Sequence, residues 1–165
     1  MLIILEGADG SGKTTLRQKF LELGYMTKAC IPHETIDWEA IRSTSNNMDV
    51  VLDRSVISDM VYRTVLRDEE RWDISLREAV RLFSENTIVI HCKTNSQYED
   101  SMQRGEDNIT DKTIARKIDA FYDDFLHFLT VFTDIKLIKY NWQKDNFNEL
   151  LKKIEKLHGG NPYGI

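Results

Sequence analysis

Cysteine and long apolar runs are both scarce in this chain of 165 residues. The two cysteines, Cys30 and Cys92, stand alone beside apolar residues, so they make neither a disulfide framework nor the paired spacing of a zinc site. The four histidines show no metal-ligand spacing either. We therefore expect both thiols to be small buried side chains within strands, and we assign no metal site to cysteine or histidine.

The apolar runs are only a few residues long, which excludes a membrane-spanning helix. No basic segment precedes the first of them, so we expect no signal peptide and a cytoplasmic location. The net charge of −5 argues against stable binding of duplex nucleic acid, although a local basic groove is compatible with it. Because no internal repeat or linker is present, we expect one domain over residues 1–157 and a flexible C-terminal tail over residues 158–165.

The strongest signal lies in residues 2–15. Four apolar residues, 2–5, predict a short buried strand, and a helical pattern begins at Leu16. Between them, in the spacing of a phosphate-binding loop, stand Gly7, Ala8, Asp9, Gly10, Ser11, Gly12, Lys13, Thr14 and Thr15. A Gly/Ser-rich turn that binds nothing is the alternative, and the strand–loop–helix context argues against it.

Each residue type in this loop has a chemical purpose. Glycines let the backbone turn its N–H groups toward phosphate oxygens. The first turn of the following helix adds unpaired N–H groups and the positive end of the helix dipole. We expect Lys13 to reach the β- and γ-phosphates of ATP, Thr14 to place its hydroxyl on Mg²⁺, and Thr15 to lie near the α-phosphate.

Apolar runs and helical patterns alternate along the rest of the chain. The expected strands are residues 2–5, 26–31, 49–53, 87–92 and 135–140. The expected helices are residues 16–23, 36–43, 55–67, 75–83, 96–104, 111–132 and 145–157, with a loop at 43–47 and Asp145 as the cap of the last helix. This alternation is typical of an α/β fold, in which helices cover both faces of a parallel sheet. Ligands of such sheets bind beyond the carboxyl ends of the strands.

Asp53 and Arg54 stand at the carboxyl end of the third expected strand. A carboxylate there can hold Mg²⁺ through water and orient it on the phosphates. The alternative for Asp53 is a helix N-cap, which aspartate also suits. The Arg54 guanidinium can clamp an acceptor phosphate or orient a neighbouring acid, and its alternative is a plain surface arginine.

The acceptor side and the lid are predicted from single residues. Glu34 follows the second strand, where it can act as a general base, bind a sugar hydroxyl, or be a solvated loop residue. Trp38 can stack on a base or anchor the core. Arg104 precedes a Gly/Asp/Asn-rich segment and fits the arginine of a small mobile lid at residues 104–110, with Arg116 as a second candidate and an exposed helix arginine as the alternative.

One aromatic stripe is expected to be structural. Residues four or three apart on a helix share one face, so a row of phenylalanines at that spacing reads as part of the core. The row consists of Phe121, Phe125, Phe128 and Phe132.

Residues 6–15 resemble the phosphate loop of thymidylate kinases. Residues 53–63, Asp-Arg-Ser-Val-Ile-Ser-Asp-Met-Val-Tyr-Arg, are similar to the Asp-Arg motif of the same family and equally to the Asp/Glu-Arg-Ser motif of deoxynucleoside kinases. The resemblance implies a P-loop NTPase three-layer sandwich with a five-stranded parallel sheet in the order 2-3-1-4-5. It also implies Mg-ATP as the phosphoryl donor and often a homodimer.

The acceptor half departs from the thymidylate-kinase pattern. That family usually carries Arg-Glu-Pro-Gly-Gly after the second strand, where this chain has Cys-Ile-Pro-His-Glu at residues 30–34, and Arg63 stands where glutamine is usual. Only about twenty residues separate Pro32 from Asp53, so the acceptor pocket is expected to be smaller, more open or completed by another chain. Glu34 and Trp38 resemble the base and the sugar-packing tryptophan of deoxynucleoside kinases, with the spacing shorter by one residue.

The sequence thus predicts a P-loop kinase that binds ATP and Mg²⁺ and phosphorylates a small nucleoside or nucleotide. The leading acceptor is a thymidylate-like deoxynucleoside monophosphate. The alternatives are the 5′-hydroxyl of a deoxynucleoside and a hydroxyl on a modified base or nucleic acid end. A partner-driven ATPase is a further alternative, whereas a guanine-nucleotide switch is disfavoured because the chain has no Asn-Lys-x-Asp motif.

Overall fold

The computed structural model describes residues 1–30, 36–67, 83, 86–93 and 111–159. Its elements in chain order are β1 (Leu2–Glu6), α1 (Lys13–Glu22), β2 (Met26–Ala29), α2 (Trp38–Ser45), β3 (Val50–Asp53), α3 (Val56–Arg67), β4 (Thr87–Cys92), α6 (Lys112–Phe132), β5 (Lys136–Tyr140) and α7 (Phe147–Leu157). The predicted helices at residues 75–83 and 96–104 lie wholly or almost wholly outside the described residues, as does the predicted lid at 104–110. The predicted tail falls outside them from residue 160 onward.

The five strands form one parallel sheet in the order β2-β3-β1-β4-β5, as predicted. β1 lies at the centre, and all five of its residues are buried. A strand covered on both faces needs apolar side chains at nearly every position, which explains its unbroken apolar run. The register brings the ends of the strands together: Leu5 pairs with Asp53 of β3, and Glu6 pairs with His91 of β4.

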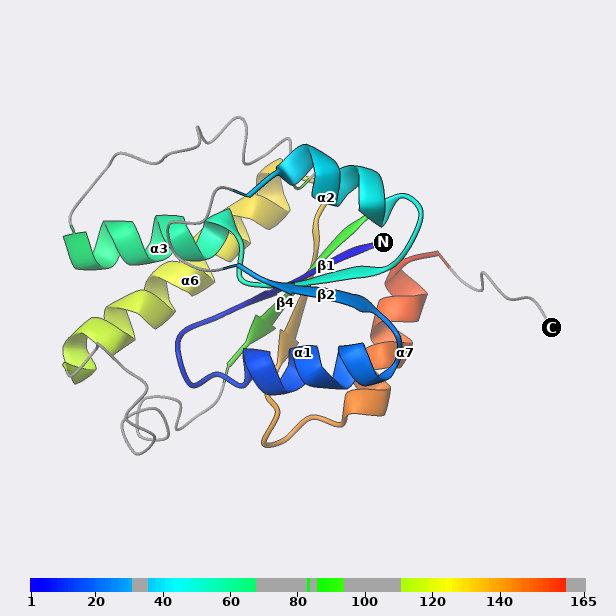
Figure 1. Cartoon of the computed structure of the whole chain (residues 1–165). Helices are drawn as coiled ribbons and strands as arrows, with labels where there is room; N and C mark the ends of the chain where they lie inside the picture. Colours follow the sequence, from blue (N-terminus) through cyan, green and yellow to red (C-terminus); the bar gives the residue numbers. More distant parts are fainter. Residues whose placement is uncertain (31–35, 68–82, 84–85, 94–110, 160–165) are drawn as a thin grey trace.

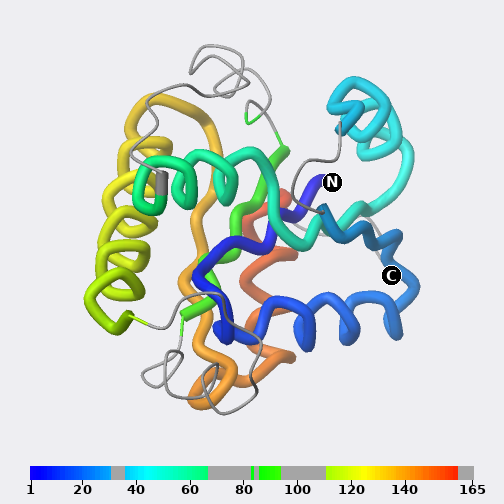
Figure 2. Tube along the Cα trace, turned by 60° about the vertical axis from the view of Figure 1, so that its left-hand side comes forward, coloured from blue at the N-terminus to red at the C-terminus, as the bar shows by residue number. Residues whose placement is uncertain are grey.

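Helices cover both faces of this sheet, which makes three layers (Figure 1). One core cluster lies between the sheet and the face formed by α2, α3 and α6, and includes Leu52, Ile57, Met60 and Leu126. The other lies beneath α1 and α7 and includes Leu5, Phe20, Ile90 and Ile154. Figure 2 shows α3 and α6 side by side, on the opposite side of the strands from α1.

Several helix boundaries match the sequence signals. Gly24 follows α1 with a φ of 87°, the left-handed conformation that ends many helices. Asp111 caps α6 through a hydrogen bond from the Thr113 amide at 2.7 Å. No helix among the described residues has the length and apolar character that a membrane span requires. Cys92 is buried in β4, and Cys30 is buried just beyond the end of β2.

Three local predictions were wrong. α2 continues to Ser45, so most of the predicted loop at 43–47 is helical. The cap of α7 is Asn146, because the Asp145 carboxylate instead accepts a hydrogen bond from the Asn141 amide in the preceding turn. Phe132 is 62% exposed, since α6 ends there beyond the edge of the packed face, whereas Phe125 of the same stripe is buried.

Candidate functional site

The phosphate loop between β1 and α1 holds two glycines that no other residue could replace without strain. Gly7 has a φ of 142°, and a Cβ built on it would lie 2.2 Å from the carbonyl oxygen of Cys92. Gly12 has a φ of 87°, and its Cβ would lie 2.4 Å from the ring of Trp142. Both backbones therefore approach their neighbours more closely than any side chain allows.

Gly12 is also the N-cap residue of α1. It provides no side-chain cap, and the first turn of α1 carries no acidic residue. The N–H groups of that turn are therefore available to an anion, which the helix dipole also favours. The hydroxyls of Thr14 and Thr15 belong to the same turn, and both residues are exposed.

Lys13 lies folded inside the loop. Its Nζ donates to the carbonyl oxygens of Gly7 and Ala8 at 2.8 and 2.7 Å and to Ser11 Oγ at 3.3 Å. Burial, together with the nearby Arg54 cation, lowers the pKa of Lys13 to about 8. A phosphate group in the loop would supply the negative charge that stabilises this buried ammonium group.

Asp53 and Thr14 meet at the mouth of the loop. Thr14 Oγ1 donates to Asp53 Oδ2 at 3.1 Å, and Arg17 Nε lies 3.9 Å from the same carboxylate oxygen. A hydroxyl and a carboxylate are hard oxygen donors, and Mg²⁺ is commonly held by one or two protein oxygens together with phosphates and water. No cluster of three or more His, Cys, Asp or Glu ligands occurs among the described residues. The pair therefore suits Mg²⁺ delivered with a nucleotide better than a metal held by protein ligands alone.

Arg54 occupies the turn between β3 and α3 with a φ of 74°. Its guanidinium pairs with the Asp9 carboxylate, donates from Nη1 to Ser58 Oγ at 3.4 Å, and lies 5.2 Å from the centroid of the Tyr62 ring. Burial alone lowers the pKa of Arg54, but Tyr62 and Asp9 raise it above its ordinary value, so the group stays charged. Arg54 is therefore a fixed cation beside the phosphate loop and no mere surface arginine.

Glu6 is a residue that the sequence analysis left without a role. Its carboxylate is fully buried and accepts hydrogen bonds from Ser55 Oγ and Ser58 Oγ, both at 2.5 Å, and from the Tyr122 hydroxyl at 3.3 Å. Burial raises the pKa of Glu6, while the hydrogen bonds from Ser55 and Ser58 oppose that rise. An acid at the end of an otherwise apolar strand was the signal available in the sequence.

Trp142 was also missed. It follows β5 at the same edge of the sheet and packs against Gly12 while 43% of it remains exposed. Hydrogen bonds within residues 141–145, including Asp145 N to Asn141 O at 2.7 Å, fix the turn that carries it. The sequence gives no direct sign of this contact, because Trp142 and Gly12 meet only in the folded sheet.

The acceptor and lid residues remain predictions. Glu34 and Arg104 both lie outside the described residues. Trp38 is half-buried and packs against the core cluster beneath α2, which fits its structural alternative. Arg116 is exposed on α6.

A cluster of charged side chains beside Tyr122 involves His91 of β4, which pairs with Glu6 in the sheet. The ring is buried, and its Nδ1 lies 3.6 Å from the Asp123 carboxylate, which is also bound by Lys93 at 2.6 Å and Lys139 at 3.1 Å. Burial lowers the pKa of His91 to about 4, so the ring is neutral near pH 7.

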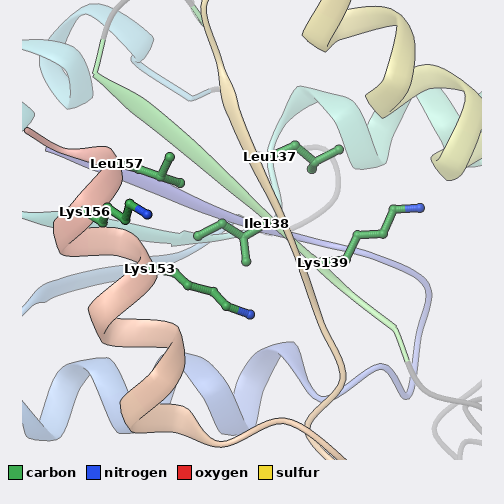
Figure 3. A pocket seen from close by; sticks show the side chains of 6 residues that line it. All are labelled: Leu137, Ile138, Lys139, Lys153, Lys156 and Leu157. Atoms are coloured by element: carbon green, nitrogen blue, oxygen red, sulfur yellow. The ribbon is translucent and has the colours of Figure 1, made fainter.

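A hollow of about 380 Å³ lies along the edge strand β5 (Figure 3). It is lined by Leu137, Ile138, Lys139, Lys153, Lys156 and Leu157. None of these residues belongs to the phosphate loop or to α3, so we do not include this hollow in the candidate site.

No protein-family model and no curated protein matches the chain. Solved structures do match it. A deoxyadenosine kinase from M. mycoides with bound dCTP has a TM-score of 0.64 at 18% identity, with 95% of this chain and 98% of that chain covered. The YorR protein from Bacillus subtilis, in complex with phosphorylated GDP, has a TM-score of 0.66 at 20% identity, with 95% of each chain covered.

A further structure of the M. mycoides deoxyadenosine kinase, with bound dATP, has a TM-score of 0.59 at 14% identity and covers 96% of this chain and 100% of that chain. At such identities the similarity shows a common fold. The predicted fold class, a P-loop NTPase three-layer sandwich with sheet order 2-3-1-4-5, is thereby confirmed.

Proposed function

We propose that this protein is a P-loop phosphotransferase that moves the γ-phosphoryl group of ATP to a nucleoside or nucleotide acceptor. The observation that carries the proposal is the meeting of Lys13, the Thr14–Asp53 pair and Arg54 at one edge of the sheet. Lys13 and the first turn of α1 bind the phosphates. Thr14 and Asp53 would hold Mg²⁺, which would neutralise charge on the phosphate oxygens.

Arg54 stabilises charge on the transferring group. Phosphoryl transfer needs little covalent chemistry from the protein, so its rate depends on positioning and on fixed charges. A guanidinium held by three neighbours is already in place before the substrate arrives. Arg104 of the predicted lid would add a second cation, and Glu34 would accept the proton of an acceptor hydroxyl.

Trp142 offers an aromatic surface on which the base of ATP, the phosphoryl donor, can stack. Its half-exposed indole lies against Gly12, where the phosphates end, and an aromatic ring can stack on any base with little preference. A tryptophan is costly to leave in water, so a ligand that covers this ring gains apolar burial.

The 5′-hydroxyl of a deoxynucleoside is the acceptor that the site supports better. Arg54 is already paired with the Asp9 carboxylate, so an acceptor phosphate would have to compete with Asp9 for the guanidinium. An uncharged sugar hydroxyl brings no second phosphate, so the transferring phosphoryl group is then the only one that competes with Asp9 for Arg54. The similar folds include a deoxyadenosine kinase, which is consistent with this choice.

A deoxynucleoside monophosphate, thymidylate-like, is the second candidate. Ser58 and Tyr62 stand in register with the thymidylate-kinase motif, and both contact Arg54. In that case the acceptor phosphate would take the place of Asp9 on the guanidinium. Homodimer formation stays a prediction for either acceptor.

The test is ADP release from Mg-ATP with a panel of deoxynucleosides and their monophosphates, together with a blank that contains no acceptor. Turnover with nucleosides supports the first candidate, and turnover confined to monophosphates supports the second. Equal ADP release without acceptor would contradict the kinase proposal and favour a partner-driven ATPase.

A further inference from the structure

A buried carboxylate beside the phosphate loop calls for an explanation, and Glu6 has no part in the proposed transfer. None of its surface is exposed, and it stands at the end of β1, one residue before the loop. Removing an ionised carboxylate from water is costly unless hydrogen bonds and a nearby cation compensate for it. Two cations, Arg54 and Lys13, lie close enough to attract it.

Each oxygen of the Glu6 side chain accepts a hydrogen bond from a serine hydroxyl. The Ser55 and Ser58 hydroxyls each donate to a different carboxylate oxygen at 2.5 Å, which is within the range for O–H···O⁻ bonds, about 2.5–2.7 Å. A serine hydroxyl has one proton, and Ser58 donates it in the hydrogen bond to Glu6. The Ser58 oxygen then accepts from Arg54 Nη1 at 3.4 Å and from the Tyr122 hydroxyl at 2.8 Å, and Tyr122 shares its single proton between Ser58 and the more distant Glu6 oxygen at 3.3 Å.

We propose that Glu6 is a positioning residue for Arg54, and that it acts through the Ser58 hydroxyl. By taking the Ser58 proton, the carboxylate turns the lone pairs of Ser58 toward the guanidinium, and its negative charge attracts the same group. This inference rests on the proposed function, in which Arg54 acts on the transferring phosphoryl group.

A purely structural role is the alternative. Ser55 directly precedes α3 and accepts from the Ile57 amide at 3.1 Å, and Ser58 lies in the first turn of α3, where a carboxylate stabilises the positive end of a helix dipole. On that view Glu6 would hold α3 against β1, and its loss would lower stability without any particular effect at Arg54. The two serines separate these alternatives, because both bind Glu6 at the same distance and both are buried, but only Ser58 contacts Arg54.

The experiment compares Glu6→Gln, Ser58→Ala and the matched control Ser55→Ala. We expect Glu6→Gln and Ser58→Ala to lower kcat about tenfold, the effect of losing one charge-assisted hydrogen bond, with KM for ATP nearly unchanged. Ser55→Ala is expected to lower kcat by about twofold at most, although it lowers thermal stability, because it removes the hydrogen bonds to Glu6 and from the Ile57 amide but no contact with Arg54. Equal kcat losses in the two serine variants would overturn the proposal.

A second measurement needs no activity. Phenylglyoxal modifies accessible arginines, and mass spectrometry can follow the reaction at Arg54 alone. We expect the rate of Arg54 modification to rise about threefold or more in Glu6→Gln and Ser58→Ala, because these two changes release the guanidinium. The rate should change little in Ser55→Ala. If the natural protein transferred no phosphate but this pattern held, the function would be wrong and the positioning role right. An unchanged Arg54 rate in all three variants would overturn the positioning role itself.

Discussion

Two opposing demands act on Lys13, the residue at the centre of the phosphate loop. Its ammonium group must be charged to bind phosphate, yet burial favours the neutral form. The hydrogen bonds to Gly7, Ala8 and Ser11 hold the side chain inside the loop. A bound phosphate would shift this balance toward the cation, so under the proposed function nucleotide binding and lysine protonation would be linked.

This linkage predicts a pH dependence for ADP binding. The pKa of Lys13 is lowered from 10.5 to about 8, so the folded protein loses the proton well before the unfolded chain does. Between those two values the unfolded state binds more protons, so this group makes the protein more stable as pH rises through the window. ADP affinity should move the opposite way and fall as pH rises through about 8, because the neutral lysine binds phosphate poorly. Titration calorimetry on both sides of that pH tests this, and an affinity that is unchanged there would contradict it.

Replacing a glycine of this chain by alanine should destabilise the protein by different amounts at different positions, which provides a second prediction. Gly7→Ala places a Cβ against the Cys92 carbonyl, whereas Gly24→Ala has nothing within 4 Å of its added Cβ, although both have positive φ. We expect Gly7→Ala to lower the free energy of unfolding by about 3 kcal/mol or more, and Gly24→Ala by about 1 kcal/mol. Urea unfolding measures both values. Equal losses would mean that the loop does not pack against β4 as described.

Trp142 leads to a third prediction. Trp142→Ala should weaken ATP binding about tenfold, the effect of losing one stacked base, and leave inorganic tripolyphosphate binding nearly unchanged, because that ligand has no base. Trp142→Phe, which retains an aromatic ring, is the matched control and should keep most of the ATP affinity. If Trp142→Ala weakened the binding of ATP and of tripolyphosphate equally, the indole would stabilise the phosphate loop and would not stack on the base.

At the scale of elements, strands were easier to predict than helix ends. The buried run of β1 and the strand at 87–92 follow directly from their apolar residues, because a central strand has no solvent face. Helix starts depend on single hydrogen bonds that compete with one another. Asp145 and Asn146 are adjacent and chemically similar, and the turn before α7 uses Asp145, which leaves Asn146 as the cap.

That competition can be measured. Asn146→Ala should lower the free energy of unfolding by about 1 kcal/mol, because the Asn148 amide loses its side-chain acceptor. Asn146→Asp, which restores an acceptor at the same position, is expected to change it little. Thermal unfolding of the two variants checks this, and a loss of stability in Asn146→Asp as large as that in Asn146→Ala would contradict the assignment.

Across the whole molecule, the donor half of the site could be read from the sequence and the connecting contacts could not. A contiguous motif gives the phosphate loop, and an acid at a strand end gives Asp53. Tyr122 and Glu6 are 116 residues apart and meet only because α6 covers the same face of the sheet as Glu6. The packing of Trp142 on Gly12 likewise depends on β5 being the outer strand next to β4. No local pattern encodes such pairs.

The most direct test of the central claim follows the γ-phosphoryl group itself. ATP labelled on its γ-phosphate is incubated with Mg²⁺, a mixture of deoxynucleosides and their monophosphates, and either the natural protein or Lys13→Ala. We predict labelled nucleotide product with the natural protein and none with Lys13→Ala, although the variant keeps its fold by circular dichroism. Label recovered only as inorganic phosphate, or equal transfer by Lys13→Ala, would contradict a phosphotransferase centred on this loop.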